Sequence, residues 1–345
     1  MSLRTGAALL APALLTLAAC ADDTLTAPGA PRAAAVATAL KDGRLATVES
    51  EGRRPALFIQ QADGTGRFRV RFANVHDRIE GNWPAEMLPV TDDRIVALGP
   101  ARWSPDGQQL AVVVTLGFDQ SQVVVMNADG RNIRTASPNG QIILGDVDWS
   151  PDSRRIASTM STLPHAQGVD LFVTDLVKDA VQRITHEGRF GVFDEYRFDA
   201  RGAGLWYTQF ESWSGDGSTR VSRVYHASLA GQVDGVPMKL EGNPQGLARD
   251  GRWAIVLRPA KGDPSVTELA RSPLFEGGEE LPLARGELMY AELVEGDDEA
   301  VLVGTSRETG LTSYGRLGIH TVADRRGTLP VSPWAASMAF LRAVR

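Results

Sequence analysis

From residue 41 onward, short apolar runs of three to five residues alternate with turn-forming Asp and Gly residues. Most of the runs consist of β-branched or aromatic residues, which is typical of strands. An Asp-Gly pair suits a tight hairpin, because Gly accepts a positive φ and Asp hydrogen-bonds its own backbone. The pattern predicts two central strands in each of six units, at residues 45–48 and 56–59, 110–114 and 123–126, 156–158 and 170–173, 205–207 and 223–225, 253–257 and 266–269, and 300–303 and 318–322.

One phrase marks a repeat. Trp-Ser-Pro-Asp-Gly at residues 103–107 returns as Trp-Ser-Pro-Asp-Ser at residues 149–153, 46 residues later. A period of this length indicates one supersecondary unit that is used several times. Four short strands in each of six units predict an all-β fold, a six-bladed β-propeller of four-stranded antiparallel blades. A seventh, incomplete blade is the competing count, because residues 334–345 follow the sixth unit. We expect Trp103 and Trp149 to pack between blades.

The repeated phrase resembles the WD40-like (PD40) propeller repeats of the TolB family. The resemblance extends to the Leu-Ala or Ile-Ala that follows the phrase. It also includes the Val-Val-Val-Met-Asn-Ala-Asp-Gly at residues 123–130. The resemblance covers residues 36–330, is closest in the second and third units and degrades in the fourth. It implies the propeller fold. TolB proteins also carry an N-terminal α/β domain, whereas only a tether precedes the repeats here, so a role in the Tol system is not implied.

The start of the chain has the layout of a targeting signal. An apolar run at residues 7–19 follows Arg4 and is too short to span a bilayer. It ends in Leu-Ala-Ala-Cys, which resembles the lipobox of bacterial lipoproteins, and Cys20 is the only cysteine. In that family the cysteine is acylated after the signal peptide is removed. An ordinary secretory signal with an incidental cysteine is the alternative.

The lipobox resemblance sets the expected domain organisation. It implies a signal peptide at residues 1–19, a lipid-anchored flexible tether at residues 20–34 and a propeller domain at residues 35–345. Ala21 follows the cysteine in place of Asp, which by the same resemblance favours the periplasmic face of the outer membrane. The cell envelope is therefore the expected location.

The net charge and the absence of known catalytic motifs reduce the number of functions that the sequence predicts. The formal net charge is −6 and no basic run is present, so we expect no nucleic-acid partner. The sequence lacks a Gly-x-Ser-x-Gly elbow, a His-Glu-x-x-His pair and a phosphate-binding loop. No catalytic residues and no cofactor are therefore assigned, and we expect a monomer.

The expected strand order sorts the loops onto two faces. Loops that join the second strand to the third, and loops between blades, lie opposite the Asp-Gly turns, and such longer loops more often carry binding. The candidate ligand-binding residues of this rim are Asp119, His165, His186, Glu187, Asp194, Glu195, Glu211, Trp213 and Asp216. A mouth lined in this way suits a small ligand or a Ca²⁺ ion, although solvated loop charges give the same pattern.

Three functions fit this sequence. The first is a lipid-anchored extracytoplasmic propeller that acts as a scaffold for an envelope protein partner or a ligand. The second is a metal-assisted polysaccharide lyase or hydrolase. Its active centre would use His165, His186, Glu187 and Glu211. The third is a protein that binds a glycan without turnover.

Overall fold

The computed structural model describes residues 36–318, except residues 42–43, 52–53, 62–64, 74, 76–89, 117–119, 138–142, 162–168, 187–192, 216, 218, 261, 287, 294–298 and 306–311. These residues belong to a compact unit that spans residues 31–345. The described part of the chain contains strands and no helix, arranged in six antiparallel sheets. It therefore holds no helix that could cross a membrane.

The first three sheets each have four strands, paired in chain order. The first sheet consists of β1 (Val36–Lys41), β2 (Arg44–Glu51), β3 (Arg54–Gln61) and β4 (Phe68–Arg69). The second consists of β5 (Ala97–Trp103), β6 (Gln109–Thr115), β7 (Ser121–Asn127) and β8 (Arg134–Thr135). The third consists of β9 (Ile143–Trp149), β10 (Arg155–Ser161), β11 (Val169–Asp175) and β12 (Ala180–Arg183).

The later sheets follow the same plan. The fourth consists of β13 (Phe193–Phe198), β14 (Gly204–Trp213), β15 (Arg220–Ser228) and β16 (Val233–Glu241). The fifth consists of β17 (Asn243–Leu247), β18 (Trp253–Ala260), β19 (Asp263–Pro273) and β20 (Leu281–Gly286). In the sixth sheet the described strands are β21 (Leu288–Leu293), β22 (Glu299–Thr305) and β23 (Thr312–Gly318).

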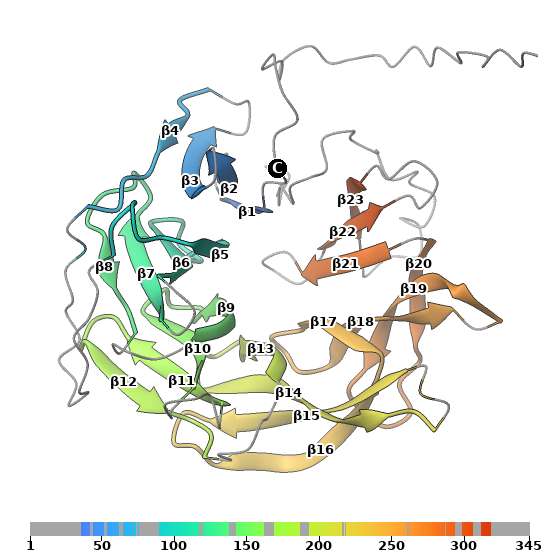
Figure 1. Ribbon diagram of the computed structural model, residues 1–345. Helices are drawn as coiled ribbons and strands as arrows, with labels where there is room; N and C mark the ends of the chain where they lie inside the picture. The colour runs from blue at the N-terminus through green and yellow to red at the C-terminus, as the bar shows by residue number, and fades with distance from the viewer. Residues whose placement is uncertain are drawn as a thin grey trace, which may run out of the picture. The chain divides into compact units, whose positions relative to one another are not determined.

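The sheets are arranged as the blades of a β-propeller. The first strand of each sheet is the innermost, and it lies beside the first strand of the next sheet, from β1 to β5, β9, β13, β17 and β21 (Figure 1). Each sheet is built from strands that are consecutive in the sequence. The all-β propeller predicted from the repeat is therefore confirmed as an architecture.

Both faces of the central strands are buried, which explains their continuous apolar runs. In β6, Leu110, Val112 and Val114 pack with the first sheet, whereas Ala111 and Val113 pack with the third sheet. Side chains alternate between the two faces of a strand, so a blade between two neighbours needs apolar residues at every position. The strands predicted within the first five units are all present at their expected positions.

The repeated phrase forms the turn between the first and second strands of a sheet. Ser150 is fully buried, and its Oγ donates to Asp152 Oδ1 at 2.5 Å and accepts from the Arg155 N–H at 2.9 Å. Ser104 forms the same two bonds, to Asp106 and from Gln109. The serine and aspartate of the phrase thus add side-chain hydrogen bonds to the backbone bonds of the turn.

The tryptophans of the phrase pack between sheets, as predicted. Trp149 is 2% exposed, and its Nε1 donates to the Arg102 carbonyl of the second sheet at 2.9 Å. The Arg44 guanidinium of the first sheet lies over the Trp103 ring, 5.2 Å from the centroid, and donates to the Gly107 carbonyl. These contacts hold each turn against its neighbour.

One ion pair joins three sheets near these turns. Arg249, just after β17, forms a bidentate pair with Asp148 of β9 at 3.1 and 3.3 Å. Between them lies β13, whose Phe198 N–H donates to Asp148 at 2.8 Å and whose Phe198 carbonyl accepts from Arg249 at 3.3 Å. Both charged side chains are less than one fifth exposed, so the pair fixes the spacing of three innermost strands.

The strand that follows β22 lies earlier in the sequence than predicted. Residues 318–322 were expected to form it, and residues 319–322 lie outside the part of the chain that the structure describes. In the structure β22 pairs with residues 312–318, and the register runs from Glu299 opposite Gly318 to Thr305 opposite Thr312. The β-branched residues at 319–322 favoured the later position, but the pairing with β22 selects a more polar segment, because context outweighs intrinsic strand preference.

Candidate functional site

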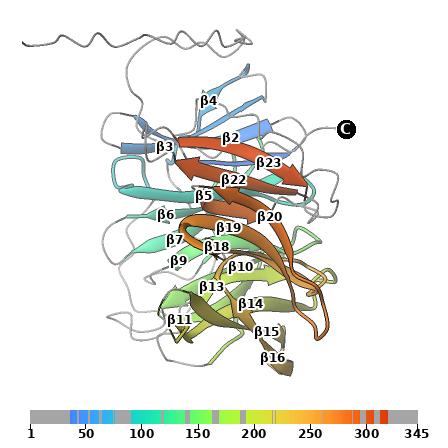
Figure 2. The same cartoon turned by 90° about the vertical axis from the view of Figure 1, so that its right-hand side faces the viewer.

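The strand order places the predicted rim at one end of the sheets. The strands run across Figure 2 from side to side, so the turns after the first strands lie at one end of the sheets and the second strands end at the other. In the fourth sheet, β14 pairs with β15 from Gly204 opposite Ser228 to Trp213 opposite Arg220, with a register shift between Phe210 and Ser212. Because β13 begins opposite Gln209, the tip of this hairpin extends beyond the innermost strand.

Trp213 is the exposed aromatic residue at this tip. Its side chain is 58% exposed, and its ring meets the Phe210 ring edge-on, with centroids 6.0 Å apart. The Arg220 guanidinium lies over Phe210, 4.6 Å from the centroid. The turn beyond is ordered by Ser214, whose Oγ accepts from the Thr219 N–H at 2.8 Å. The hairpin therefore exposes the large apolar ring of Trp213, which is held by its contact with Phe210 and by the hydrogen-bonded turn that follows.

Glu211 lies on the same strand and is held by an ion pair. Its Oε1 accepts from Arg223 Nη2 of β15 at 2.9 Å, and both side chains are 40% exposed. The hydrogen bond and charge of Glu211 raise the pKa of Arg223 above its ordinary value. The hairpin that carries Trp213 therefore also carries a partly exposed pair of opposite charges.

The other described rim residues lie on β13 and in the connection that precedes it. Glu195 belongs to β13 and is half-buried, and its backbone N–H donates to Thr208 Oγ1 at 3.1 Å. Asp194 lies in the same strand. His186 is exposed in the connection between β12 and β13. Of the predicted set, the structure thus places Glu211 and Trp213 on β14 and Asp194 and Glu195 on the neighbouring β13.

Several predicted residues lie outside the described part of the chain, so their placement stays a prediction. They are Cys20, Asp119, His165, Glu187 and Asp216. Among the residues that the structure does describe, no three His, Cys, Asp or Glu side chains gather in a way that could hold a metal ion.

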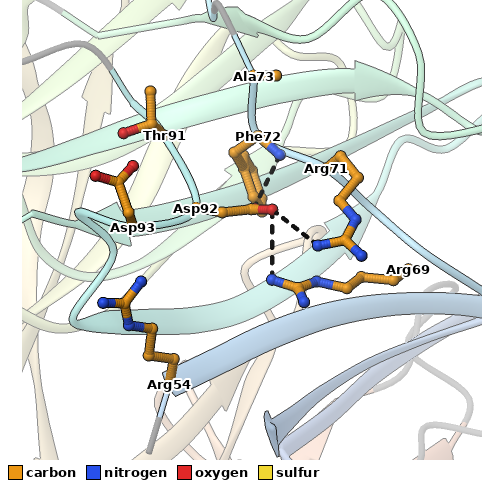
Figure 3. Close-up of a pocket in the computed structure, with 8 residues that line it drawn as sticks. All are labelled: Arg54, Arg69, Arg71, Phe72, Ala73, Thr91, Asp92 and Asp93. Atoms are coloured by element: carbon orange, nitrogen blue, oxygen red, sulfur yellow. Dashed lines mark hydrogen bonds and ion pairs between the residues drawn. The ribbon is translucent and has the colours of Figure 1, made fainter.

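A cavity that the sequence reasoning missed lies between the first sheet and the segment that leads into β5. Its volume is about 520 Å³, and it is lined by Arg54, Arg69, Arg71, Phe72, Ala73, Thr91, Asp92 and Asp93 (Figure 3). Three guanidinium groups and two carboxylates therefore share one concave surface.

Asp92 organises one side of this cavity. Its Oδ1 accepts from the Phe72 N–H at 3.1 Å, and its Oδ2 lies 3.3 Å from Arg69 Nη2 and 3.4 Å from Arg71 Nη1. The Asp92 N–H in turn donates to the Phe72 carbonyl at 3.0 Å. One carboxylate thus positions two guanidinium groups and fastens the segment around residue 92 to the end of the first sheet.

Asp93 and Arg54 lie on the other side of the cavity (Figure 3). The Thr91 hydroxyl near its carboxylate is the main reason that the pKa of Asp93 lies below its usual value. The positive charges of Arg94 and Arg54 act in the same direction. Asp93 is therefore a carboxylate acceptor at neutral pH.

A sequence signal for this cavity exists, although it is weak. Arg67, Arg69 and Arg71 alternate with Phe68, Val70 and Phe72. Val70 and Phe72 are almost fully buried, so a period of two places the arginines on the opposite face of the chain. The alternation could have indicated a basic strand face, but it does not identify Asp92 as its partner.

Comparisons with known proteins agree on the fold. No family model and no curated protein matches the chain. Among solved structures, TolB from Acinetobacter baumannii matches with a TM-score of 0.53 and 17% identity, over 81% of this chain and 64% of that chain. The chain therefore spans less than two thirds of the length of this TolB.

Two further solved structures show the same similarity. The β-propeller domain of the Trilobed protease from Pyrococcus furiosus matches with a TM-score of 0.52 and 12% identity, covering 82% of each chain. An oligogalacturonate lyase in complex with manganese matches with a TM-score of 0.50 and 11% identity, over 79% of this chain and 70% of that chain. Identities this low show the fold alone, so the chain is a TolB-like β-propeller in architecture.

Proposed function

We propose that this protein is a lipid-anchored, six-bladed propeller of the PD40 type that binds a partner protein in the bacterial cell envelope. In this proposal the signal peptide is removed before Cys20, and the acylated cysteine holds the propeller at the periplasmic face of the outer membrane. The TolB-like fold supports an envelope scaffold. The protein acts as a monomer without a cofactor.

The exposed Trp213 hairpin is the observation that carries the partner proposal. Tryptophan and arginine dominate the binding energy of protein interfaces, and the strongest contributors are surrounded by a polar border. Trp213 is more than half exposed, and the Glu211–Arg223 pair lies on the same hairpin. Trp213 itself is paired with Arg220 in the β14–β15 ladder, which reduces the backbone ordering that binding needs.

Pull-down from envelope extracts tests this proposal with three proteins: the wild-type chain, Trp213→Ala and Val236→Ala. Val236 is 86% exposed in β16, a different strand of the same sheet, so it is a control for the loss of an exposed apolar group. We expect the wild type and Val236→Ala to retain the same partner and Trp213→Ala to lose it. Loss of a central tryptophan should weaken binding about thirtyfold or more.

Two outcomes would contradict the proposal. One is that no protein is retained by the wild type, and the other is that Trp213→Ala retains the partner as well as the control does. Equal thermal unfolding of the three proteins would show that the comparison reports binding and not folding.

A further inference from the structure

The cavity beside the first sheet has the volume of a ligand site and a lining dominated by charged groups. Its volume of about 520 Å³ lies within the range of roughly 300–1,000 Å³ that is typical of small-molecule pockets. Its polar groups come from three separate segments: Arg54 opens β3, Arg69 and Arg71 lie in and after β4, and residues 91–93 precede β5. Groups from distant parts of the sequence thus converge on one space.

The charges of the cavity favour an oxyanion. Three arginines outnumber the two aspartates that share the lining. The Asp92 carboxylate accepts from both Arg69 and Arg71, which holds these two guanidinium groups side by side before any ligand arrives (Figure 3). Guanidinium forks match carboxylate and phosphate groups through paired, charge-assisted hydrogen bonds.

The remaining lining favours hydroxyl groups next to that oxyanion. Asp93 is a carboxylate beside the Thr91 hydroxyl, across the cavity from Arg71 (Figure 3). A carboxylate repels a second anion but accepts hydrogen bonds from hydroxyl groups. A ligand that satisfies both sides therefore carries one anionic group and several hydroxyls.

We propose that this cavity binds a sugar that bears one oxyanion, with the anion on Arg54, Arg69 and Arg71 and a ring hydroxyl donating to Asp93. The anion can belong to a sugar acid or to a sugar phosphate, and the chemistry of recognition is the same for both. This site is separate from the Trp213 hairpin, which belongs to the fourth sheet.

Calorimetric titration of the full-length chain with four probes tests the proposal. Glucuronate and glucose 6-phosphate represent the two sources of the anion, inorganic phosphate lacks the hydroxylated ring, and glucose lacks the charge. We expect saturable binding of glucuronate, glucose 6-phosphate or both, and the tighter of the two identifies the source. Glucose should not bind, and phosphate should bind at least tenfold more weakly than the better sugar.

Substitutions assign the binding to the cavity. Arg54→Gln and Arg71→Gln should each weaken the sugar ligand tenfold or more, since each removes a charged donor from the anion. Arg71 is 67% exposed, so its replacement should leave the fold intact. Arg131→Gln is the matched control, because Arg131 is 83% exposed beyond β7, pairs with Asp129 at 4.0 Å and does not line the cavity.

Asp93→Asn separates the two halves of the proposed site. Loss of this negative charge should leave phosphate binding unchanged or tighter, because it removes repulsion, whereas the sugar ligand should bind several-fold more weakly. The proposal is overturned if neither sugar anion binds saturably, if phosphate binds as tightly as the sugars, or if Arg54→Gln and Arg71→Gln bind like Arg131→Gln. Capture of a protein partner is read out separately, so failure of either proposal is recognised independently.

Discussion

Single charged residues within the blades make specific contributions that can be measured. Glu268 of β19 has a side chain that is 1% exposed, and its carboxylate pairs with Arg258 of β18 at 2.9 Å and with Arg285 of β20 at 2.6 Å. Burial by itself would raise the pKa of Glu268, but the hydrogen bonds from Arg258 and then Arg285 outweigh it and lower the pKa. This residue therefore links three adjacent strands of the fifth sheet through its charged form.

Glu268→Gln should lower the free energy of unfolding by about 2 kcal/mol at pH 7, since it removes the buried carboxylate that pairs with Arg258 and Arg285, while Arg258 keeps its pair with Glu280. The pKa of Glu268 is lower in the folded protein than its ordinary value of 4.5, so the unfolded chain binds more protons. The stabilisation is therefore present above about pH 4.5 and is lost as the pH falls through the lower folded pKa. Urea unfolding of both proteins between pH 7 and pH 3 measures this difference.

Glu241→Gln provides the control for this pH series. Glu241 pairs with Lys239 at 2.7 Å, but both side chains are more than half exposed, so its replacement should change stability by less than about 1 kcal/mol. A stability difference between wild type and Glu268→Gln that stays constant as the pH falls would contradict the argument.

At the scale of elements, the turns explain how blades are fastened to each other. Ser153 takes the place in the third sheet that Gly107 has in the second, and both have a positive φ, 59° and 70°. A residue with a Cβ is strained in this conformation, by about 1–2 kcal/mol. Ser153 also accepts a hydrogen bond at its Oγ from the Asp106 N–H of the preceding turn, at 3.1 Å. The hydroxyl therefore joins two neighbouring blades.

Substitutions at Ser153 separate these two effects. Ser153→Ala keeps the strain and loses the bond between turns, so it should lower the free energy of unfolding by about 1 kcal/mol. Ser153→Gly also loses the bond but relieves the strain, so its stability should lie close to that of the wild type. Urea unfolding compares the two variants with Gly217→Ala, which adds a Cβ at a φ of +72° where no atom lies within 4 Å. Equal stability of the two Ser153 variants would refute this account.

The repeat made most of the elements predictable. Each central strand carries apolar residues on both faces, and the polar turn residues bond within five positions of each other, so local sequence determines both. The cavity was not predictable in this way, because Asp92 meets Arg69 and Arg71 across more than 20 residues that follow no repeat. The Trp213 hairpin was only partly predictable: the residue was chosen as a rim candidate, but the extension of β14 beyond β13 depends on strand pairing.

At the scale of the whole molecule, the contacts that hold the sheets together and the candidate binding surfaces lie in different parts of the propeller. The turns between the first and second strands form contacts between sheets, such as Arg249 with Asp148 and Arg44 with Gly107. The exposed hairpin and the cavity lie in segments that depart from the repeat. In scaffolds built from repeats, the repeated strands commonly form the rigid framework and the irregular segments bind ligands or partners.

A lipid anchor is the remaining part of the proposed function, and it makes a prediction for the whole chain. A single acyl chain holds a protein only marginally, whereas several chains on one cysteine give stable attachment. The wild-type chain should therefore partition with membranes, and Cys20→Ser should appear in the soluble fraction or remain an uncleaved precursor. Fractionation, labelling with a fatty acid and the mass of the mature chain provide the readouts. Thr24→Ser in the same segment is the control, and fractionation of Cys20→Ser like the wild type would refute the anchor.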